Sequence, residues 1–368
     1  MKFIDLQAQY LVYKSEIDEA IARVFAHGQF INGPEVVELE RELARFVGVN
    51  HCITTASGTD SLEIGLRSLG VGPGDEVITV PFTFISSAEA IELVGAKVVL
   101  VDIEPRTYNI DVTKLREAVT ERTKAIIPVS LFGQMSDLKA VNEIAEEFGL
   151  SVIEDGAQSF GATLDGHRSC SMTTIGSTSF FPAKPFGCYG EGGALFTNDE
   201  SLGRRMKRIR NHGSERRDHH ENIGLNGRFD TIQAATLLAK LPHFLKELQA
   251  RQRLGNTYSD SLKGMAAIPI VEEGRTHVYG QYTVRLPERE QFRKDLDSAG
   301  IPTGVYYSKC IHEQAALSHY GYQRGDFPES EKASAEVVSL PMHPFLTEED
   351  QGKIISEAKK SIEVARSE

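Results

Sequence analysis

Short apolar runs alternate with amphipathic stretches between residues 51 and 153 of this chain. A strand and a helix in turn, repeated at this spacing, are typical of βαβ units, in which the strands lie parallel. The expected strands are His51–Thr55, Glu76–Val80, Lys97–Val101, Ala125–Val129 and Ser151–Ile153. The expected helices are Asp60–Leu69, Ser87–Val94, Val112–Val119 and Leu138–Phe148. The pattern therefore predicts an α/β fold with a mainly parallel sheet flanked by helices.

The later part of the chain follows another pattern. Phe229–Leu248 predicts a long helix that Pro242 breaks. Residues 268–288 predict antiparallel strands, and a helix is expected near Arg289–Ala299. A length of 368 residues suggests roughly two domains. We expect a large domain over residues 1–245 and a smaller C-terminal α+β domain over residues 246–368.

Composition excludes several classes of function. The net charge of −12 argues against a general nucleic-acid or anionic-membrane surface. No apolar run approaches the roughly 18 residues of a membrane helix, and Asp5 and Gln7 stand where a secretory signal has its apolar core. Without CxxC pairs, the cysteines predict neither a zinc site nor a disulfide framework, and no other metal site is expected. These are Cys52, Cys170, Cys188 and Cys310. A reducing, cytoplasmic location is expected.

The segment TTASGTDSLEIGL (54–66) places Ser57, Gly58 and Thr59 between an expected strand and an expected helix. Free N–H groups at a helix N-terminus, with small and hydroxyl side chains, form an anion site. The simpler interpretation is an ordinary helix cap made by Thr59 or Asp60. No GxxxxGK[ST] phosphate loop occurs in the chain.

A second segment, VIEDGAQSFGA (152–162), ends an apolar strand in Glu154 and Asp155, with Gln158 close behind. In open parallel sheets ligands bind beyond the carboxyl ends of the strands. An acid at that position can hold a positively charged ring nitrogen, although a helix-capping acid would look the same. Adjacent strand residues point to opposite faces, which argues against a joint metal site.

A third segment, STSFFPAKPFGCYGEGGALFTND (177–199), sets Lys184 between two prolines in apolar surroundings. Desolvation lowers the pKa of an amine and makes it a nucleophile for carbonyl groups. That is the chemistry of a Schiff-base lysine, whereas most lysines simply lie at the surface. Phe180 and Phe181 are expected in the core.

Together, a phosphate cradle, a carboxylate and a buried lysine are what pyridoxal phosphate needs. The chain also resembles the DegT family of nucleotide-sugar aminotransferases, fold-type I pyridoxal-phosphate enzymes, from FIDL (3–6) to SLPMHP (339–344). The motifs that carry this resemblance, in the family's order, are SGTDSL, PFTF, EDGAQSFGA, SFFPAKPFGCYGEGGA and LNGRFDTIQAATLLAKL.

The resemblance implies four roles around the cofactor ring. Lys184 would form the Schiff base and move the proton during transamination. Asp155 would pair with the pyridinium nitrogen. Gln158 would form a hydrogen bond near the phenolic oxygen, and Phe84 of PFTF would stack on the ring.

The resemblance also implies how the phosphate is held. Gly58, Thr59 and Ser179 would bind it from the same chain. Asn226 of LNGRF would reach it from the neighbouring subunit. The expected assembly is a homodimer with two shared active sites.

Within the family, the chain resembles the UDP-2-acetamido-2-deoxy-3-oxo-glucuronate aminotransferases, and like them it has Ser130 where many members have His. That subgroup moves an amino group from L-glutamate to the C3 ketone of the UDP-sugar, for cell-surface polysaccharide or O-antigen synthesis. Arg228 would contact the sugar carboxylate or the nucleotide. Tyr306 and Tyr307 stand where the subgroup shows a substrate-facing His-Tyr pair, and a phenol cannot act as a cation near neutral pH.

Several alternatives remain open. The Tyr306 departure keeps another keto-sugar in view, such as a dTDP-6-deoxy ketose aminated at C3 or C4. A sugar dehydratase of this fold would carry His in place of Lys184. A DNA-binding regulator would need a basic segment, and a purely structural protein would not explain the motifs. The stretch RRMKRIRNHGSERR (204–217) predicts a solvated helix face, and the alternative is that Arg216 and Arg217 help bind the diphosphate or the donor carboxylate.

Overall fold

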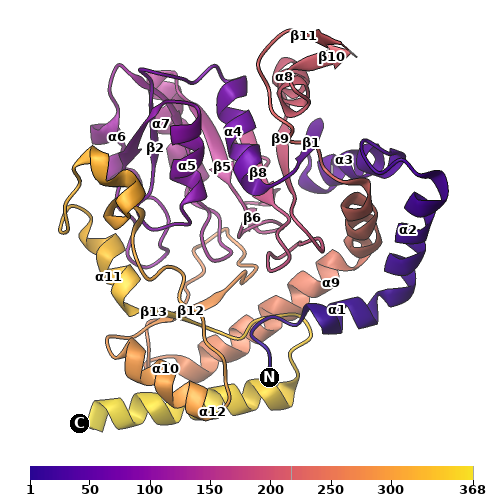
Figure 1. Ribbon diagram of the computed structural model, residues 1–368. Helices are drawn as coiled ribbons and strands as arrows, with labels where there is room; N and C mark the ends of the chain where they lie inside the picture. The colour runs from indigo at the N-terminus through magenta and orange to yellow at the C-terminus, as the bar shows by residue number, and fades with distance from the viewer. Residues whose placement is uncertain (217, 368) are drawn as a thin grey trace.

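A seven-stranded sheet forms the centre of the computed structural model (Figure 1), which describes residues 1–216 and 218–367. The strand order is β1-β9-β8-β5-β4-β2-β3. Each strand among β8, β5, β4, β2 and β3 pairs in parallel with its neighbour. Strand β9 runs antiparallel to both β8 and β1. The bounds are β1 His51–Thr55, β2 Glu76–Thr79, β3 Lys97–Leu100, β4 Thr123–Ile126, β5 Ser151–Asp155, β8 Ile175–Ser179 and β9 Gly193–Thr197. The predicted mainly parallel α/β fold is confirmed.

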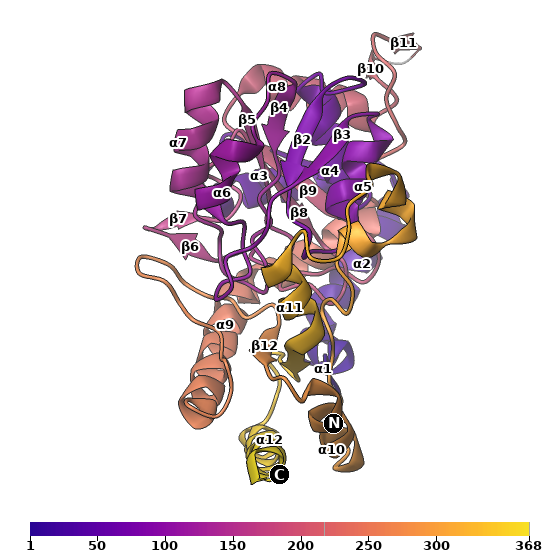
Figure 2. The ribbon, with the colours of Figure 1, turned by 90° about the vertical axis from the view of Figure 1, so that its left-hand side faces the viewer.

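Helices cover both faces of this sheet. Figure 2 shows α4 and α5 on one side of the strands and α6 and α7 on the other. Neighbouring residues of β2 belong to different apolar cores: Val77 packs with α4 and α5, whereas Ile78 packs with α6 and α7. The helices that flank the sheet are α3 Pro34–Val47, α4 Gly58–Ser68, α5 Ser86–Leu93, α6 Val112–Ala118, α7 Leu138–Phe148 and α8 Glu200–Arg210.

The helix boundaries follow from capping residues that the sequence displays. Asp137 accepts a hydrogen bond from the N–H of Ala140 and starts α7. Gly149 ends α7 in the left-handed region, at φ 67°. Such local signals explain why α7 and β1 match their predicted ranges residue for residue.

The long helix α9 (Thr231–Leu262) runs through Pro242, so the predicted break is wrong. An interior proline costs about 3 kcal/mol because it removes one backbone hydrogen bond and crowds the preceding turn. Phe244, Tyr258 and Leu262 are buried beyond it, and burying each such side chain contributes roughly 1.5–3 kcal/mol. Packing along the whole helix therefore outweighs the local cost.

The C-terminal part has its own apolar core, in which α10, α12 and the end of α9 pack on a small sheet. Of the expected strands in residues 268–288, the structure has β12, which pairs with the distant β13. The expected helix near Arg289–Ala299 is present as α10. The bounds are β12 Tyr282–Arg285, α10 Arg289–Ser298, η1 Ile311–Glu313, η2 Ala315–Tyr320, α11 Pro328–Glu336, β13 Val337–Leu340 and α12 Glu348–Ser367. The predicted domain boundary, between residues 245 and 246, falls within α9.

The remaining elements lie around this framework. A β10–β11 hairpin projects beyond the sheet next to α8 (Figure 1). Over residues 1–216 and 218–367, no helix combines the length and the apolar content that crossing a membrane requires. The bounds are α1 Leu6–Val12, α2 Lys14–His27, β6 Thr163–Leu164, β7 His167–Arg168, β10 Ser214–Arg216 and β11 His219–His220.

Candidate active site

Asp155 is the last residue of β5, a central strand of the sheet. Its Oδ2 accepts a hydrogen bond from the hydroxyl of Ser87 at 3.0 Å, and its Oδ1 accepts one from the N–H of Ala157 at 3.2 Å. The residue is only 7% exposed. The strand and the first turn of α5 thus fix a buried acid at the carboxyl edge of the sheet.

Lys184 lies in the turn after β8, where its N–H donates to the carbonyl oxygen of Phe181 at 2.9 Å. Burial lowers the pKa of its ammonium group, and the negative charge of Asp155 partly offsets this change. Burial raises the pKa of Asp155, and the charge of Lys184 opposes that. The amine and the acid are therefore close enough for their charges to interact, in a place that disfavours an isolated charge.

Gln158 and two aromatic rings stand beside this pair. Gln158 donates from Nε2 to the hydroxyl of Tyr307 at 3.1 Å and accepts from the N–H of Phe132 at 2.9 Å. The ring of Phe84 lies 6.1 Å from that of Tyr307, between centroids. Phe84 is 53% exposed, so its ring remains available for a flat ligand. Tyr306 lies next to them, its ring 5.9 Å from that of Tyr307.

The turn between β1 and α4 approaches the end of β8 closely. A Cβ added to Gly58 would lie 2.7 Å from the Cβ of Ser179, so only glycine fits there. Ser57 caps α4 by accepting a hydrogen bond from the N–H of Asp60 at 3.0 Å. The alternative that Thr59 or Asp60 is the cap is therefore wrong. Because Ser57 takes the cap, Thr59 remains in the first helical turn beside Gly58 and Ser179.

Asn226 and Arg228 lie elsewhere, around a cavity of about 370 Å³ that Ile31, Ala56 and Glu191 also line. Asn226 is exposed. Arg228 donates to the amide oxygen of Asn211 at 3.1 Å, and its buried Nε has no partner.

The loop that carries Asn226 and Arg228 is anchored to the β1–α4 turn, since the N–H of Ala56 donates to the carbonyl oxygen of Gly227 at 2.9 Å. Within the described part of the chain, no hydrogen bond or ion pair joins either side chain to Asp155 or Lys184. The structure therefore brings nine of the eleven predicted residues to the sheet edge and the turns around it, Tyr306 and Tyr307 included, whereas Asn226 and Arg228 line a separate cavity.

The predictions for the neighbouring segments hold only in part. Phe180 is buried as expected, but Phe181 is 44% exposed because the chain turns outward after β8. Arg210 is not on a solvated face: it is buried, forms an ion pair with Glu40 and donates to the carbonyl oxygen of Thr54 at 2.9 Å. Arg216 is exposed on β10, and Arg217 lies outside the described residues.

The sequence interpretation missed the hydrogen-bonding partners of the two adjacent acids, Asp155 and Glu154. Ser87 holds Asp155, and its only signal is a small hydroxyl residue at the start of a helix after PFTF. Glu154 accepts hydrogen bonds from the hydroxyls of Ser130 at 2.9 Å and Ser169 at 2.8 Å. Burial and the charge of Asp155 raise the pKa of Glu154. The two adjacent acids thus contact different residues on opposite sides of β5.

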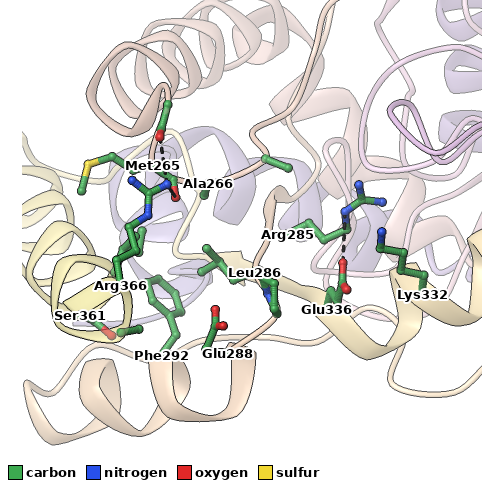
Figure 3. Close-up of a pocket in the computed structure, with 15 residues that line it drawn as sticks. Met265, Ala266, Arg285, Leu286, Glu288, Phe292, Lys332, Glu336, Ser361 and Arg366 are labelled. Atoms are coloured by element: carbon green, nitrogen blue, oxygen red, sulfur yellow. Dashed lines mark hydrogen bonds and ion pairs between the residues drawn. The ribbon is translucent and has the colours of Figure 1, made fainter. Parts of the chain in front are cut away.

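A larger cavity, of about 540 Å³, lies in the C-terminal part between α10, α12 and β12 (Figure 3). Arg285 and Glu336 form an ion pair at 3.5 Å on one side of it, and Arg366 lies on the other. None of the predicted site residues line this cavity. Size alone therefore does not select a candidate active site, whereas the interacting charges of Asp155 and Lys184 do.

Comparisons with known proteins agree with the motifs. The model of the DegT/DnrJ/EryC1/StrS aminotransferase family matches residues 12–359. The chain is 51% identical over 347 residues to UDP-2-acetamido-2-deoxy-3-oxo-D-glucuronate aminotransferase of Pseudomonas aeruginosa, covering 94% of this chain and 96% of that protein.

Solved structures give the same result. A DegT DnrJ EryC1 StrS aminotransferase from Brucella abortus has a TM-score of 0.95 at 42% identity, covering 98% of this chain and 99% of that one. NtdA from Bacillus subtilis, solved with bound cofactor PMP, has a TM-score of 0.89 at 30% identity, covering 98% of this chain and 83% of that one. On this evidence the resemblance seen in the motifs is confirmed, and the chain belongs to the DegT/DnrJ/EryC1/StrS aminotransferase family.

Proposed function

We propose that this protein is a pyridoxal-phosphate aminotransferase that carries an amino group from L-glutamate to the C3 ketone of a UDP-linked 3-oxo-sugar. The single observation that carries the proposal is the interaction between Lys184 and the buried Asp155 at the carboxyl edge of the sheet. The choice of sugar, UDP-2-acetamido-2-deoxy-3-oxo-D-glucuronate, is supported by the 51% identical relative from Pseudomonas aeruginosa. The product would be an amino sugar for polysaccharide assembly.

The residues present fit the cofactor. Asp155 is a buried carboxylate that interacts with no cation other than Lys184 among the groups that shift its pKa, and a protonated ring nitrogen would neutralise it. The close approach of Gly58 to Ser179 leaves small groups around the α4 N-terminus, where Thr59 also lies. A helix N-terminus of this kind suits a phosphate. The PMP bound to NtdA supports the same cofactor class.

Pyridoxal phosphate, when bound, supplies an aldehyde that links covalently to amines and a ring that accepts electrons. The chain's own residues do the rest. Lys184 would hold the cofactor through its amine, and its Nζ would take the proton from the α-carbon of the donor. Asp155 would keep the ring nitrogen protonated, Gln158 would bind the phenolic oxygen, and Phe84 would pack against the ring. A lowered amine pKa suits Lys184 to proton transfer near neutral pH.

The sugar would be recognised by other residues. Arg228 has a buried Nε without a partner, and a guanidinium suits a carboxylate or diphosphate. Tyr306 and Tyr307 lie beside Gln158 and Phe84. Because burial raises the pKa of both phenols, they stay neutral and act as hydrogen-bonding groups. A dTDP-linked 6-deoxy ketose, aminated at C3 or C4, is the second candidate because Tyr306 replaces the subgroup's histidine.

We propose further that the protein acts as a homodimer in which Asn226 of each subunit reaches the phosphate bound by the other. The support is an exposed apolar surface beside Asn226: Phe30 is 43% and Ile31 is 48% exposed. Ile31 also lines the cavity that holds Asn226 and Arg228. Exposed apolar residues that adjoin a polar pocket are typical of an interface.

The proposed division into a large domain (1–245) and a small domain (246–368) is supported by the separate C-terminal core around Tyr258, Tyr282 and Ile354. A cytoplasmic location is supported by the absence of disulfides among the described residues. Cys52, Cys170, Cys188 and Cys310 are all free and buried, as is usual in a reducing compartment.

The absorption spectrum of the purified protein with pyridoxal phosphate tests the proposal. We expect a yellow band that bleaches when L-glutamate is added and returns when the UDP-3-oxo-glucuronate sugar follows. Return of the band with a dTDP-6-deoxy ketose alone would favour the second candidate. A protein that stays colourless with pyridoxal phosphate would refute the proposal.

A further inference from the structure

A second buried lysine, Lys240 on α9, has no part in the proposed chemistry. Only 3% of it is exposed. Its Nζ donates a hydrogen bond to the carbonyl oxygen of Gly187 and lies 5.0 Å from the centroid of the Tyr189 ring. Both contacts are to the segment that follows Lys184. A buried ammonium is costly unless it is paired and hydrogen-bonded, so these contacts call for an explanation.

The helix α9 contacts this segment at three points on one face. Gln233 accepts a hydrogen bond from the N–H of Tyr189 at 2.9 Å. Phe244 packs its ring 4.6 Å from that of Phe186, between centroids. Positions 233, 240 and 244 recur at helical spacing and therefore share one side of the helix. Lys240 is the central and the only charged contact of the three.

The segment itself is folded back tightly, with Gly187 packed against the backbone that precedes Lys184. A Cβ added to Gly187 would lie 2.5 Å from the carbonyl oxygen of Phe181 and 2.6 Å from that of Pro182. The N–H of Cys188 donates to the carbonyl oxygen of Phe180 at 2.8 Å. Lys184 stands inside this closed turn, so a force that fixes Gly187 also fixes the backbone from which Lys184 projects.

The charge of Lys240 is compensated by groups away from the catalytic pair. Burial lowers the pKa of Lys240 to about 8, and the charge of Arg251 also lowers it. Glu247, seven residues further along α9, and Cys188 oppose this change. Glu247 is itself held by Gln9 of α1, which donates to both carboxylate oxygens at 3.1 Å. Lys240 is therefore joined to the Lys184 turn by a hydrogen bond and to Glu247 by a charge interaction.

We propose that Lys240 is a positioning residue for Lys184: its ammonium group ties the carbonyl of Gly187 to α9 and so fixes the turn that presents Lys184 to the reacting carbon. This inference rests on the proposed function for its catalytic consequence. The structural part, the anchoring of the turn, stands without it.

The test compares Lys240→Met with Lys246→Met, a matched control that removes an exposed lysine from the same helix. In the cofactor-free protein, we expect hydrogen exchange at the amides of Lys184 and Cys188 to speed up in Lys240→Met only. In the loaded enzyme, we expect the titration midpoint of the visible band to shift. We also expect kcat to fall by about 10- to 100-fold, because small displacements of a catalytic group cost that much, with the KM for the sugar unchanged.

Lys240→Arg keeps the positive charge and the donors, and it should restore slow exchange and most of the activity. If Lys240→Met does not fold, Lys240→Met combined with Glu247→Gln removes both charges of the pair and is measured in the same way. Exchange, midpoint and kcat that all match the wild type would overturn the inference. A wild-type protein that never turns yellow would instead refute the proposed function, and the exchange rates would still decide whether Lys240 fixes the turn.

Discussion

The predicted site residues fall into two regions that differ in how far one chain completes them. Around Lys184, a charge interaction and hydrogen bonds already connect Asp155, Gln158 and Tyr307. Around Asn226, the side chain is exposed and the buried Nε of Arg228 has no partner. The first region is organised before any ligand or partner arrives, whereas the second is left open.

The difference follows from the elements that carry each region. The first stands on the ends of β5 and β8, on the turns that follow these two strands, and on the first turns of α4 and α5. The second stands on the loop between the β10–β11 hairpin and α9, at the outside of the sheet. Loops commonly carry binding and catalytic groups, and the scaffold beneath a loop positions them. We infer that the first region performs the chemistry and the second awaits another subunit or the sugar.

The largest expected effect comes from removing the amine of the first region. Lys184→Ala should reduce turnover by about 10³-fold or more, since both the covalent link and the proton transfer are lost. Steady-state assays measure the loss, and an unchanged circular dichroism spectrum shows that the fold is intact. Turnover near the wild-type value would remove Lys184 from its role.

Asp155→Asn should come next, lowering kcat by about 10²-fold because the positive charge of the ring nitrogen loses its buried counter-charge. In the cofactor-free protein, by contrast, the same substitution should raise the stability of the fold at neutral pH. Burial raises the pKa of Asp155 in the fold, so its stability contribution is present at low pH and lost as the pH rises through that pKa.

Thermal melts of cofactor-free protein test this sign. Asp155→Asn should melt higher than the wild type at pH 7, and the difference should shrink as the pH falls toward 4. A variant that is less stable than the wild type at pH 7 would contradict the cost assigned to this buried charge.

Asn226→Ala should weaken cofactor binding about tenfold, the loss of one hydrogen bond to a charged group. A mixture with Lys184→Ala shows which subunit supplies Asn226. If the sites are shared, a mixed dimer has one site with both native residues, so mixing the two variants at a cofactor concentration too low to load Asn226→Ala should restore up to about a quarter of wild-type turnover. No recovery in verified mixed dimers would mean that each chain uses its own Asn226.

Tyr307→Phe should have the smallest effect, about fivefold in kcat/KM, because it removes one hydrogen bond of roughly 1 kcal/mol from Gln158. The ring contacts with Phe84 and Phe82 remain. Kinetics with Tyr306→Phe as the comparison variant would show which phenol the sugar senses. A loss as large as that of Asp155→Asn would place Tyr307 in the chemistry itself.

Much of the framework was predictable from local patterns. The starts of β1, β2, β3 and β5 agree with the sequence ranges, because each short apolar run follows a turn or cap signal. β4 starts two residues earlier than predicted, because Thr123 is drawn into pairing with β2. Pro242 and residues 268–288 were misjudged for a shared reason: packing with residues far along the chain decided their structure.

The candidate site shows the same limit. The motifs predicted Gly58, Asp155 and Lys184 because the three occur together in the family's order, whereas each one alone also fitted an ordinary structural role. Ser87 carried only a weak local signal, a hydroxyl residue at a helix start, and Lys240 carried none. Their roles depend on contacts 68 residues away for Ser87 and 53 residues away for Lys240.

By itself, the sequence determined the fold class, the family and the chemistry of the site, because strand periodicity, caps and reactive side chains are local properties of the chain. Only the tertiary structure decided which groups meet. It placed Asp155 close enough to Lys184 for their charges to interact. It put the side chain of Glu154 on the other side of β5 from Asp155, and it left the buried Nε of Arg228 without a partner. The physical reason is that burial and charge interaction depend on distances in space, which spacing along the chain does not fix.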